Sequence, residues 1–239
     1  MSVLLQIISF SATLASLFMV VSPVITVKNM RAVKSIGGIT VTFFCAQLLN
    51  CSVWAMYGVL TVSFPLIICN TIGSAVAVYC IFMFLAVAWM EEKAGHTHVS
   101  TSYRASRKVA LFTTLVITLF MLLLLYLARY ANRSFAIQLN GILGGCCVIF
   151  MLSSPLALAR SIVRNENAEP LQPVTVIFAT LNSVLWTLYG VLKQDAYITI
   201  PNALCTLACF FQIALLMRYG RRPSEHIAII DATAPGLLD

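Results

Sequence analysis

Two residue types that can bind a small polar ligand occur twice in this sequence, at one fixed spacing. Trp54 and Asn70 in the first half return as Trp186 and Asn202 in the second, in both cases 132 residues later (186 minus 54 and 202 minus 70). An indole has an apolar face on which a ring can stack, and a carboxamide both donates and accepts hydrogen bonds. Two such sets across a pseudo-twofold axis would suit a sugar, which combines apolar C–H faces with hydroxyl groups.

Two more residue pairs keep the same spacing and extend the expected site. Asn50 and Asn182 stand four residues before the two tryptophans, on the same helical face and one turn deeper. They could line the site, or equally well join helices by hydrogen bonds within the membrane. Tyr57 and Tyr189 stand three residues after the tryptophans and nearer the outer end, so they could close the outer mouth. An aromatic belt at the membrane surface is the alternative interpretation.

The repetition extends over most of each half, so it indicates the duplication of a whole unit rather than a chance match. Each half is therefore expected to form one three-helix unit. The residues Phe18, Met19, Ser22, Pro23, Leu49, Asn50, Trp54, Tyr57, Gly58, Val59, Leu60 and Asn70 return as Phe150, Met151, Ser154, Pro155, Leu181, Asn182, Trp186, Tyr189, Gly190, Val191, Leu192 and Asn202.

The composition indicates that the solvent for this chain is lipid. Of its 239 residues, 60% are hydrophobic and only 10% are charged, with a mean hydropathy of +0.94, whereas soluble domains carry about 25% charged residues. The net charge of +7 comes from short basic clusters between apolar runs. These clusters mark membrane topology and form no basic face for nucleic acid. All eight cysteines lie inside apolar segments and are interpreted as small core residues.

Long runs without charged residues predict seven membrane-spanning helices. The run from 35 to 90 would be roughly 80 Å long as one helix, far longer than a hydrocarbon core of about 30 Å, so it must fold back once. We place this turn between Gly58 and Pro65. The predicted spans are 3–27, 38–60, 63–89, 109–129, 135–159, 172–192 and 196–217.

The expected fold is an all-α transmembrane bundle of seven helices, built as two parallel three-helix repeats joined by an inverting linker helix (3+1+3). The fourth span lies between the repeats and returns the chain to its starting side, so both repeats point the same way. We divide the chain into a first repeat (1–90), a cytoplasmic loop with linker helix 4 (91–134), a second repeat (135–217) and a cytoplasmic tail (218–239).

Lysine and arginine are concentrated on one side of the predicted bundle, which places the N-terminus outside and the C-terminus in the cytoplasm. Asn132, in the glycosylation sequon Asn132-Arg133-Ser134, falls on the outer side and adds minor support. We expect an integral membrane protein, in the plasma membrane in preference to an endomembrane. The cytoplasmic side would carry Lys28, Arg31, Lys34, Lys93, Arg104, Arg107, Lys108, Arg160, Arg164, Arg218, Arg221 and Arg222, and the outer side only Arg129, Arg133 and Lys193.

Groups that could couple transport to protons are absent from the predicted spans. All eight acidic residues fall outside them, so no carboxylate relay is available within the membrane. His96, His98 and His226 lie in a polar loop and in the tail, where they lack partners for a metal site. We therefore expect no cofactor, no metal and no enzymatic activity, and a solute that moves passively down its gradient.

Taken together, the motifs resemble those of the SWEET sugar transporters, a family built from parallel repeats. Its halves carry Ser-Pro or a similar pair in the first helix, Trp-x-x-Tyr-Gly in the second and Asn in the third. The match covers nearly all of residues 5–217. It comprises Ser22-Pro23, Trp54 to Gly58 and Asn70, followed by Ser154-Pro155, Trp186 to Gly190 and Pro201-Asn202.

The resemblance implies a function and a set of binding residues. The family works as energy-independent, bidirectional uniporters with alternating access and often forms homo-oligomers, so the implied partners are a small sugar, the lipid bilayer and further copies of the chain. Met19 and Met151 are bulky where the pocket narrows, which favours a monosaccharide such as glucose over sucrose, although methionine is flexible. The implied binding residues are Asn70 and Asn202 for sugar hydroxyls, Trp54 and Trp186 beside the ring, and Asn50, Asn182, Met19 and Met151 around them.

Prolines at matched positions are candidate hinges. Pro23 and Pro155 each follow a serine near the cytoplasmic ends of the first and fifth spans, where the loss of a helical hydrogen bond permits a hinge or a passive kink. The resemblance implies a further proline early in the second and sixth helices. None occurs from 38 to 60, whereas the sixth helix offers Pro170 or Pro173, so the hinge set of the first half is incomplete.

Three other functions remain open from the sequence. A seven-helix receptor would also have its N-terminus outside, but a tandem repeat and the lack of a loop cysteine pair argue against it. A PQ-loop carrier of amino acids, usually proton-coupled, would need an intramembrane acid and a Pro-Gln dipeptide, whereas Gln172-Pro173 has the opposite order. A non-transporting membrane scaffold would bind a solute without flux.

Overall fold

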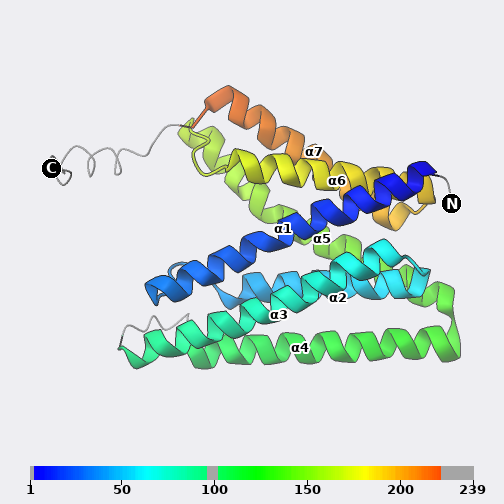
Figure 1. The fold of residues 1–239 in the computed structure, drawn as a ribbon, viewed down its shortest axis with the longest axis horizontal. Helices are drawn as coiled ribbons and strands as arrows, with labels where there is room; N and C mark the ends of the chain where they lie inside the picture. Colours follow the sequence, from blue (N-terminus) through cyan, green and yellow to red (C-terminus); the bar gives the residue numbers. More distant parts are fainter. Residues whose placement is uncertain (1–2, 96–101, 222–239) are drawn as a thin grey trace.

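Seven long helices make up the part of the chain that the computed structural model describes, residues 3–95 and 102–221 without the side chains of 21 and 153–155 (Figure 1). Each is long and apolar enough to cross a bilayer, and these residues contain no β-strand, so the prediction of an all-α, seven-span protein is confirmed. The helices are α1 (Val3–Val33), α2 (Val41–Thr61), α3 (Phe64–Lys93), α4 (Tyr103–Tyr126) with its π-helical continuation η2 (Leu127–Ala131), α5 (Arg133–Asn165), α6 (Pro173–Lys193) and α7 (Ala196–Tyr219).

A tight turn joins α2 to α3, within the segment predicted to fold back. Val62 adopts a left-handed conformation (φ 56°), and its N–H donates to the carbonyls of Gly58 and Val59. A Cβ on Gly58 would lie 2.9 Å from the backbone nitrogen of Ile67, closer than real Cβ contacts. Only glycine therefore lets α3 fold back so tightly against α2.

The second repeat reproduces this turn between α6 and α7. Gln194 is left-handed (φ 53°), and a Cβ on Gly190 would lie 2.8 Å from the backbone nitrogen of Thr199. Thr199 follows Ile67 by the repeat offset of 132 (199 minus 67). The glycine that ends each Trp-x-x-Tyr-Gly motif is thus required by the turn that follows it.

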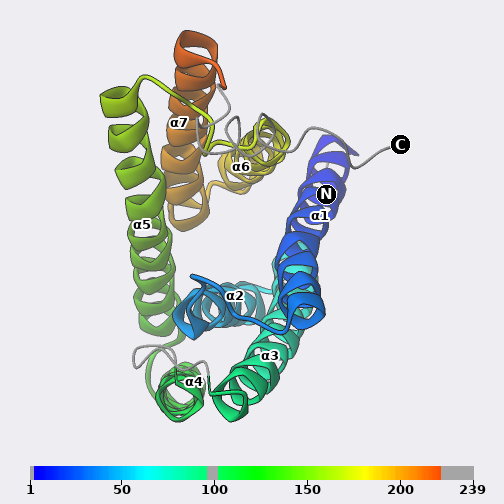
Figure 2. The same cartoon turned by 90° about the vertical axis from the view of Figure 1, so that its left-hand side faces the viewer.

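The third helix of each repeat lies between the other two. Within the first repeat α3 packs against both α1 and α2, and within the second α7 packs against both α5 and α6. The two repeats meet through equivalent pairs, α1 with α6 and α2 with α5. Helix α4 lies outside this arrangement, beside α2 and α3 (Figure 2). The predicted 3+1+3 architecture is confirmed, with the linker helix attached to the first repeat.

We call the end of the bundle at which α1 ends the basic end, and the other the opposite end. The helices continue beyond the predicted spans at the basic end: α1 runs through Lys28 and Arg31 to Val33, and α5 runs to Asn165, whereas the predicted limits were 27 and 159. Long basic side chains can extend from a helix into the headgroup layer. A charge-free run therefore marks the part of a helix in hydrocarbon and not its full length.

Two acidic residues in the last turn of α3 hold neighbouring segments at the basic end. The Glu91 carboxylate accepts hydrogen bonds from Ser35 Oγ (2.9 Å) and from the backbone N–H of Ile36 (3.1 Å). The Glu92 carboxylate accepts from the backbone N–H of Tyr103, at the start of α4 (2.9 Å). These carboxylates therefore stabilise the segments that connect the helices, and they lie far from the middle of the bundle.

Candidate substrate-binding site

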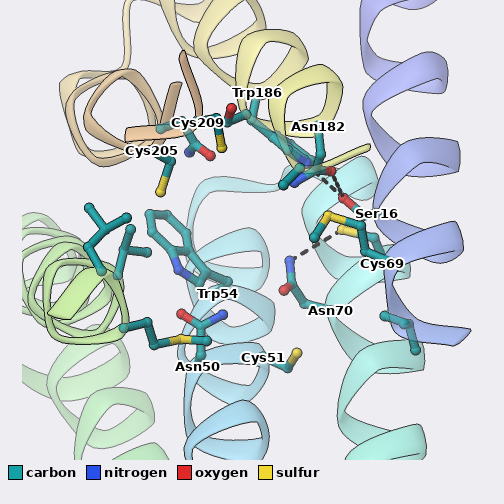
Figure 3. A pocket seen from close by; sticks show the side chains of 18 of the residues that line it. Ser16, Asn50, Cys51, Trp54, Cys69, Asn70, Asn182, Trp186, Cys205 and Cys209 are labelled. Carbon is teal, nitrogen blue, oxygen red and sulfur yellow. Dashed lines mark hydrogen bonds between the residues drawn. The ribbon is translucent and has the colours of Figure 1, made fainter. Parts of the chain in front are cut away.

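A cavity of about 480 Å³ lies between the two repeats. This volume is within the range of roughly 300–1,000 Å³ found for small-ligand pockets. Figure 3 shows side chains from both repeats around it. Every residue proposed from the sequence as a binding residue lines this cavity: Met19, Asn50, Trp54 and Asn70 from the first repeat, and Met151, Asn182, Trp186 and Asn202 from the second.

The two tryptophans come from α2 and α6 and are fixed by aromatic neighbours one turn further along. Trp54 packs edge-to-face on Tyr57, with ring centroids 5.6 Å apart, and Trp186 packs in the same way on Tyr189 at 5.3 Å. A Cβ on Gly144 of α5 would lie 3.1 Å from the Trp54 ring, so α5 approaches that indole closely. Both rings are held rigidly enough to serve as walls for a ligand.

The two asparagines of the third helices have one equivalent hydrogen bond, and Asn70 Nδ2 makes a second one to Cys69 Sγ (3.3 Å, Figure 3). Asn70 Nδ2 donates to the Leu66 carbonyl (2.9 Å), and Asn202 Nδ2 donates to the Ile198 carbonyl (2.8 Å), in each case one turn back in the same helix. Within the described residues, neither side-chain oxygen accepts a hydrogen bond. Each carboxamide is thus oriented by its own helix and keeps an acceptor for the cavity.

The asparagines of the second helices differ from each other, because only one has a serine partner. Ser16 Oγ donates to Asn182 Oδ1 (2.8 Å) and accepts from Trp186 Nε1 (2.8 Å), so α1 bridges both groups of α6. The position related to Ser16 by the repeat is Val148 (148 minus 16 is 132). Accordingly, Asn50 Oδ1 is buried without a hydrogen-bond partner.

Hydrogen bonds between the repeats close the cavity at the opposite end. Tyr57 Oη donates to both carboxylate oxygens of Asp195 (3.0 and 2.9 Å), and the hydroxyls of Tyr189 and Ser63 lie 2.7 Å apart. Asp195 follows Ser63 by 132 residues, so the two pairs are related by the repeat. Both tyrosines are buried, at 2% and 3% exposure, and do not form an exposed aromatic belt.

Two further contacts join α5 to α2 in the same half of the molecule. Arg133 donates to the Leu60 carbonyl (2.9 Å from Nη2), and the fully buried Asn140 donates from Nδ2 to the Val53 carbonyl (3.1 Å). The residues described here contain no such hydrogen bond between the repeats at the basic end. Hydrogen bonds between the repeats therefore extend from the opposite end to the level of Ser16.

The cavity opens toward the basic end. Its lining reaches the exposed Thr175, in the first turn of α6, whereas toward the opposite end it stops at Leu66 and Ile198, which are 3% and 2% exposed. None of the described residues that line it is charged. The site can therefore receive a neutral polar solute from one side, and it offers amide acceptors and indole faces rather than charges.

Pro23, Pro173 and Asn132 do not line the cavity. Pro23 is buried within α1, ten residues before its end, and Pro173 is the first residue of α6. Pro155 falls within α5, but its side chain is outside the described residues. Asn132 is exposed and caps α5, where its Oδ1 accepts from the backbone N–H of Phe135 (3.1 Å). The histidines His96, His98 and His226 are outside the described residues.

Sequence reasoning missed several lining residues. Ser16 lies one turn before Met19 on α1, so helical spacing could have identified it as a lining residue. The repeat could not, because the residue at the equivalent position is Val148. The eight cysteines were interpreted as small core residues, but four of them line the cavity, namely Cys51, Cys69, Cys205 and Cys209.

A family model described as "Sugar efflux transporter for intercellular exchange" matches the chain twice, at residues 6–92 and 138–224. The two matches begin 132 residues apart (138 minus 6), which is the offset of the repeat. Together they cover well over half of the chain.

Curated relatives and a solved structure agree with this match. The chain is 26% identical to "Sugar transporter SWEET1" of Dictyostelium discoideum, covering 90% of this chain and 94% of the relative. It is 30% identical to "Bidirectional sugar transporter SWEET7b" of Oryza sativa subsp. japonica, covering 84% and 72%. A solved eukaryotic SWEET transporter has the same fold, with a TM-score of 0.74, 24% identity, and coverage of 90% of this chain and 98% of that one. The chain therefore belongs to the SWEET family of sugar transporters.

Proposed function

We propose that this protein is a passive, bidirectional uniporter that carries a small sugar by alternating access, and that it prefers a monosaccharide such as glucose to sucrose. One observation carries the proposal: repeat-related Asn and Trp side chains line a single cavity between two halves that are hydrogen-bonded to each other on one side of it only. The names of the rice relatives, which are bidirectional sugar transporters, support the same function.

The chemistry of the lining supports a neutral, hydroxyl-rich ring as the solute. The free carboxamide oxygens of Asn70 and Asn202 can accept hydrogen bonds from sugar hydroxyls. The indoles of Trp54 and Trp186 can pack against apolar ring faces. Met151 is 42% exposed and lines the cavity together with its counterpart Met19, so both narrow the space available to a second sugar ring.

Passive transport is supported by the absence of charge from the lining of the cavity. A carrier that moves protons with its solute needs a group that titrates beside the solute. Asp195 accepts from Tyr57 at the closed end, and it also caps α7 by accepting from the backbone N–H groups of Tyr197 and Ile198. We assign it to closure rather than to proton coupling.

For alternating access, we propose that the two repeats rock about the cavity. The pairs Tyr57–Asp195 and Tyr189–Ser63 would separate, and the basic ends of the repeats would approach each other. We propose Pro23, Pro155 and Pro173 as the hinges, because the first two lie within α1 and α5, which each contact a helix of the other repeat. The proposal includes homo-oligomers. Each chain contains a complete cavity, so every copy in such an oligomer could transport the solute by itself.

For orientation, we propose that the basic end faces the cytoplasm, with the N-terminus outside, in the plasma membrane. The excess of lysine and arginine at the basic end supports this sidedness. The cavity in this structure would then be open to the cytoplasm and closed to the outside.

The experiment that tests the proposal is uptake of radiolabelled glucose into proteoliposomes that contain the purified protein. We expect uptake to reach equilibrium without accumulation, with or without a pH gradient, and sucrose to move more slowly. The double variant Asn70→Ala/Asn202→Ala should abolish flux, whereas Asn165→Ala, at the end of α5 and outside the cavity, should retain it. Accumulation driven by a pH gradient would contradict uniport, and the absence of flux of any sugar from folded protein would contradict sugar transport.

A further inference from the structure

A second cavity, of about 760 Å³, lies between α3 and α4, apart from the cavity between the repeats. It lies on the outer surface of the first repeat, where Phe82 and Leu111 are 68% and 61% exposed. Helix α4 packs more extensively against α2 than against α3, and it lies beside both of them in Figure 2. Residues of α3 and α4 make up most of the lining of the groove. Leu48 of α2, Ile81, Ala110 and Ile117 are the buried lining residues and form its floor.

The groove is apolar along most of its length. Its two threonines offer no free donor, because Thr114 Oγ1 donates to the Ala110 carbonyl (2.9 Å) and Thr118 Oγ1 donates to the Thr114 carbonyl (2.8 Å). A sugar would therefore find no free threonine donor along this length. The remaining polar groups of the lining, from Trp89, Tyr103 and Arg107, lie together at the basic end of the groove.

That end of the groove is positively charged. Lys93 Nζ lies 4.1 Å above the Trp89 ring, and the Arg107 guanidinium lies 5.8 Å from the centre of the Tyr103 ring. Within the described residues, neither cation forms an ion pair with a carboxylate. The nearby Glu92 already accepts from the backbone N–H of Tyr103. A groove with an apolar floor and unpaired cations at one end has the chemistry of an amphiphile site for an anion.

The length of the groove fits one leaflet of a bilayer. The lining of α3 runs from Val78 to Trp89, which is about 16 Å of helix, and half of a hydrocarbon core is about 15 Å. We propose that this groove binds an anionic phospholipid of the leaflet at the basic end, with one acyl chain between α3 and α4 and its phosphate on Arg107 and Lys93. A second copy of the chain fits the groove less well, because in the same orientation it would bring its own basic end to this depth.

The test is native mass spectrometry of the purified full-length protein, released from nanodiscs of equal phosphatidylserine and phosphatidylcholine. We expect the protein to retain phosphatidylserine preferentially and Arg107→Gln to lower its retention about fivefold, since one cation near the membrane surface contributes about 1 kcal/mol. Arg104→Gln is the matched control, because it removes the same charge from α4 without lining the groove. Arg107→Lys should keep most of the retention, and glucose-dependent thermal stabilisation of each variant verifies its fold.

A second variant tests the acyl chain separately. Ala86 lines the groove and is exposed, so Ala86→Trp should fill it and lower the retention of both lipids. Equal losses of phosphatidylserine in Arg104→Gln and Arg107→Gln would overturn the proposal in favour of general surface charge. If Ala86→Trp dissociates oligomers and leaves lipid retention unchanged, the groove is an interface between copies and the proposal is wrong.

Discussion

Replacing Val148 by serine should weaken glucose binding about thirtyfold, because the new hydroxyl would take the place of a sugar hydroxyl. Ser16, on α1 of the first repeat, already links Asn182 to the indole N–H of Trp186 in the second repeat, with both distances 2.8 Å. The equivalent position is Val148, on α5 of the second repeat, and within the described residues Asn50 Oδ1 of the first repeat has no hydrogen-bond partner. We expect a sugar hydroxyl to make the equivalent link there, after the Asn50 carboxamide turns about its last, soft torsion.

The magnitude follows from the number of hydrogen bonds transferred. A sugar hydroxyl that joins Asn50 to the Trp54 N–H gains two hydrogen bonds, each with a net value of about 0.5–1.5 kcal/mol, and leaves no buried acceptor unpaired. A serine at 148 would make these bonds in the empty protein. The sugar would then lose about 1–3 kcal/mol of binding free energy, or roughly five- to 150-fold in Kd, with about thirtyfold at the midpoint.

The assay is titration of purified protein with radiolabelled glucose in a scintillation proximity format. Val148→Ala is the control, because it removes methyl groups without adding a hydroxyl, and it should change Kd less than Val148→Ser. The mirror variant Ser16→Val should lower the unfolding free energy of the empty protein by about 1–3 kcal/mol, since it leaves Asn182 and Trp186 without their bridge. Equal or tighter glucose binding by Val148→Ser would refute the reasoning and make the serine hydroxyl itself a sugar ligand.

Three further predictions concern closure, the turns and pH. Tyr57→Phe should speed hydrogen–deuterium exchange of the α2–α3 turn, because it removes the bonds to Asp195, together about 1.5–3 kcal/mol; unchanged exchange would contradict this. Gly58→Ala should lower Tm by several degrees, since its Cβ would lie 2.9 Å from the backbone nitrogen of Ile67, and a wild-type Tm would show that α3 shifts freely. Glucose flux should be the same from about pH 6 to pH 8 because none of the described lining residues is charged; a sigmoidal pH profile over this range would contradict it.

The sequence predicted well which residues line the cavity where the repeat acted as an internal control. Asn70 and Asn202 are equivalent in sequence, and they also make equivalent hydrogen bonds to their own helices. The offset of 132 therefore identified positions that share a backbone environment. It could not identify Ser16, because that residue matters through a contact present in one repeat only.

Contacts between elements far apart in the chain were beyond sequence reasoning. The tyrosines were interpreted as belt residues or as a closure, and a burial of 2–3% is a property of packing that no local pattern encodes. The partner of Tyr57 is Asp195, 138 residues away. Helix ends were misjudged for a related reason, since Lys28 and Arg31 end the apolar run but not the helix. Charge patterns report the solvent around a helix, whereas hydrogen bonds determine where the helix ends.

The two hydrogen-bonded pairs at the closed end, Tyr57–Asp195 and Tyr189–Ser63, differ in strength. Their strengths determine how readily the proposed uniporter could open without an energy source. Tyr57 donates to a carboxylate, which contributes about 1.5–3 kcal/mol, whereas the Tyr189–Ser63 bond joins neutral hydroxyls and contributes about 0.5–1.5 kcal/mol. Breaking both would cost about 2–4.5 kcal/mol, less if water replaces them, so the form open at the opposite end is a minor but accessible state. A solute can shift such an equilibrium only by its difference in affinity for the two forms. In the proposed mechanism, a sugar bound by both halves would supply that difference, and because no charged side chain among the described lining residues has to move with it, its own gradient would be sufficient to set the direction of flux.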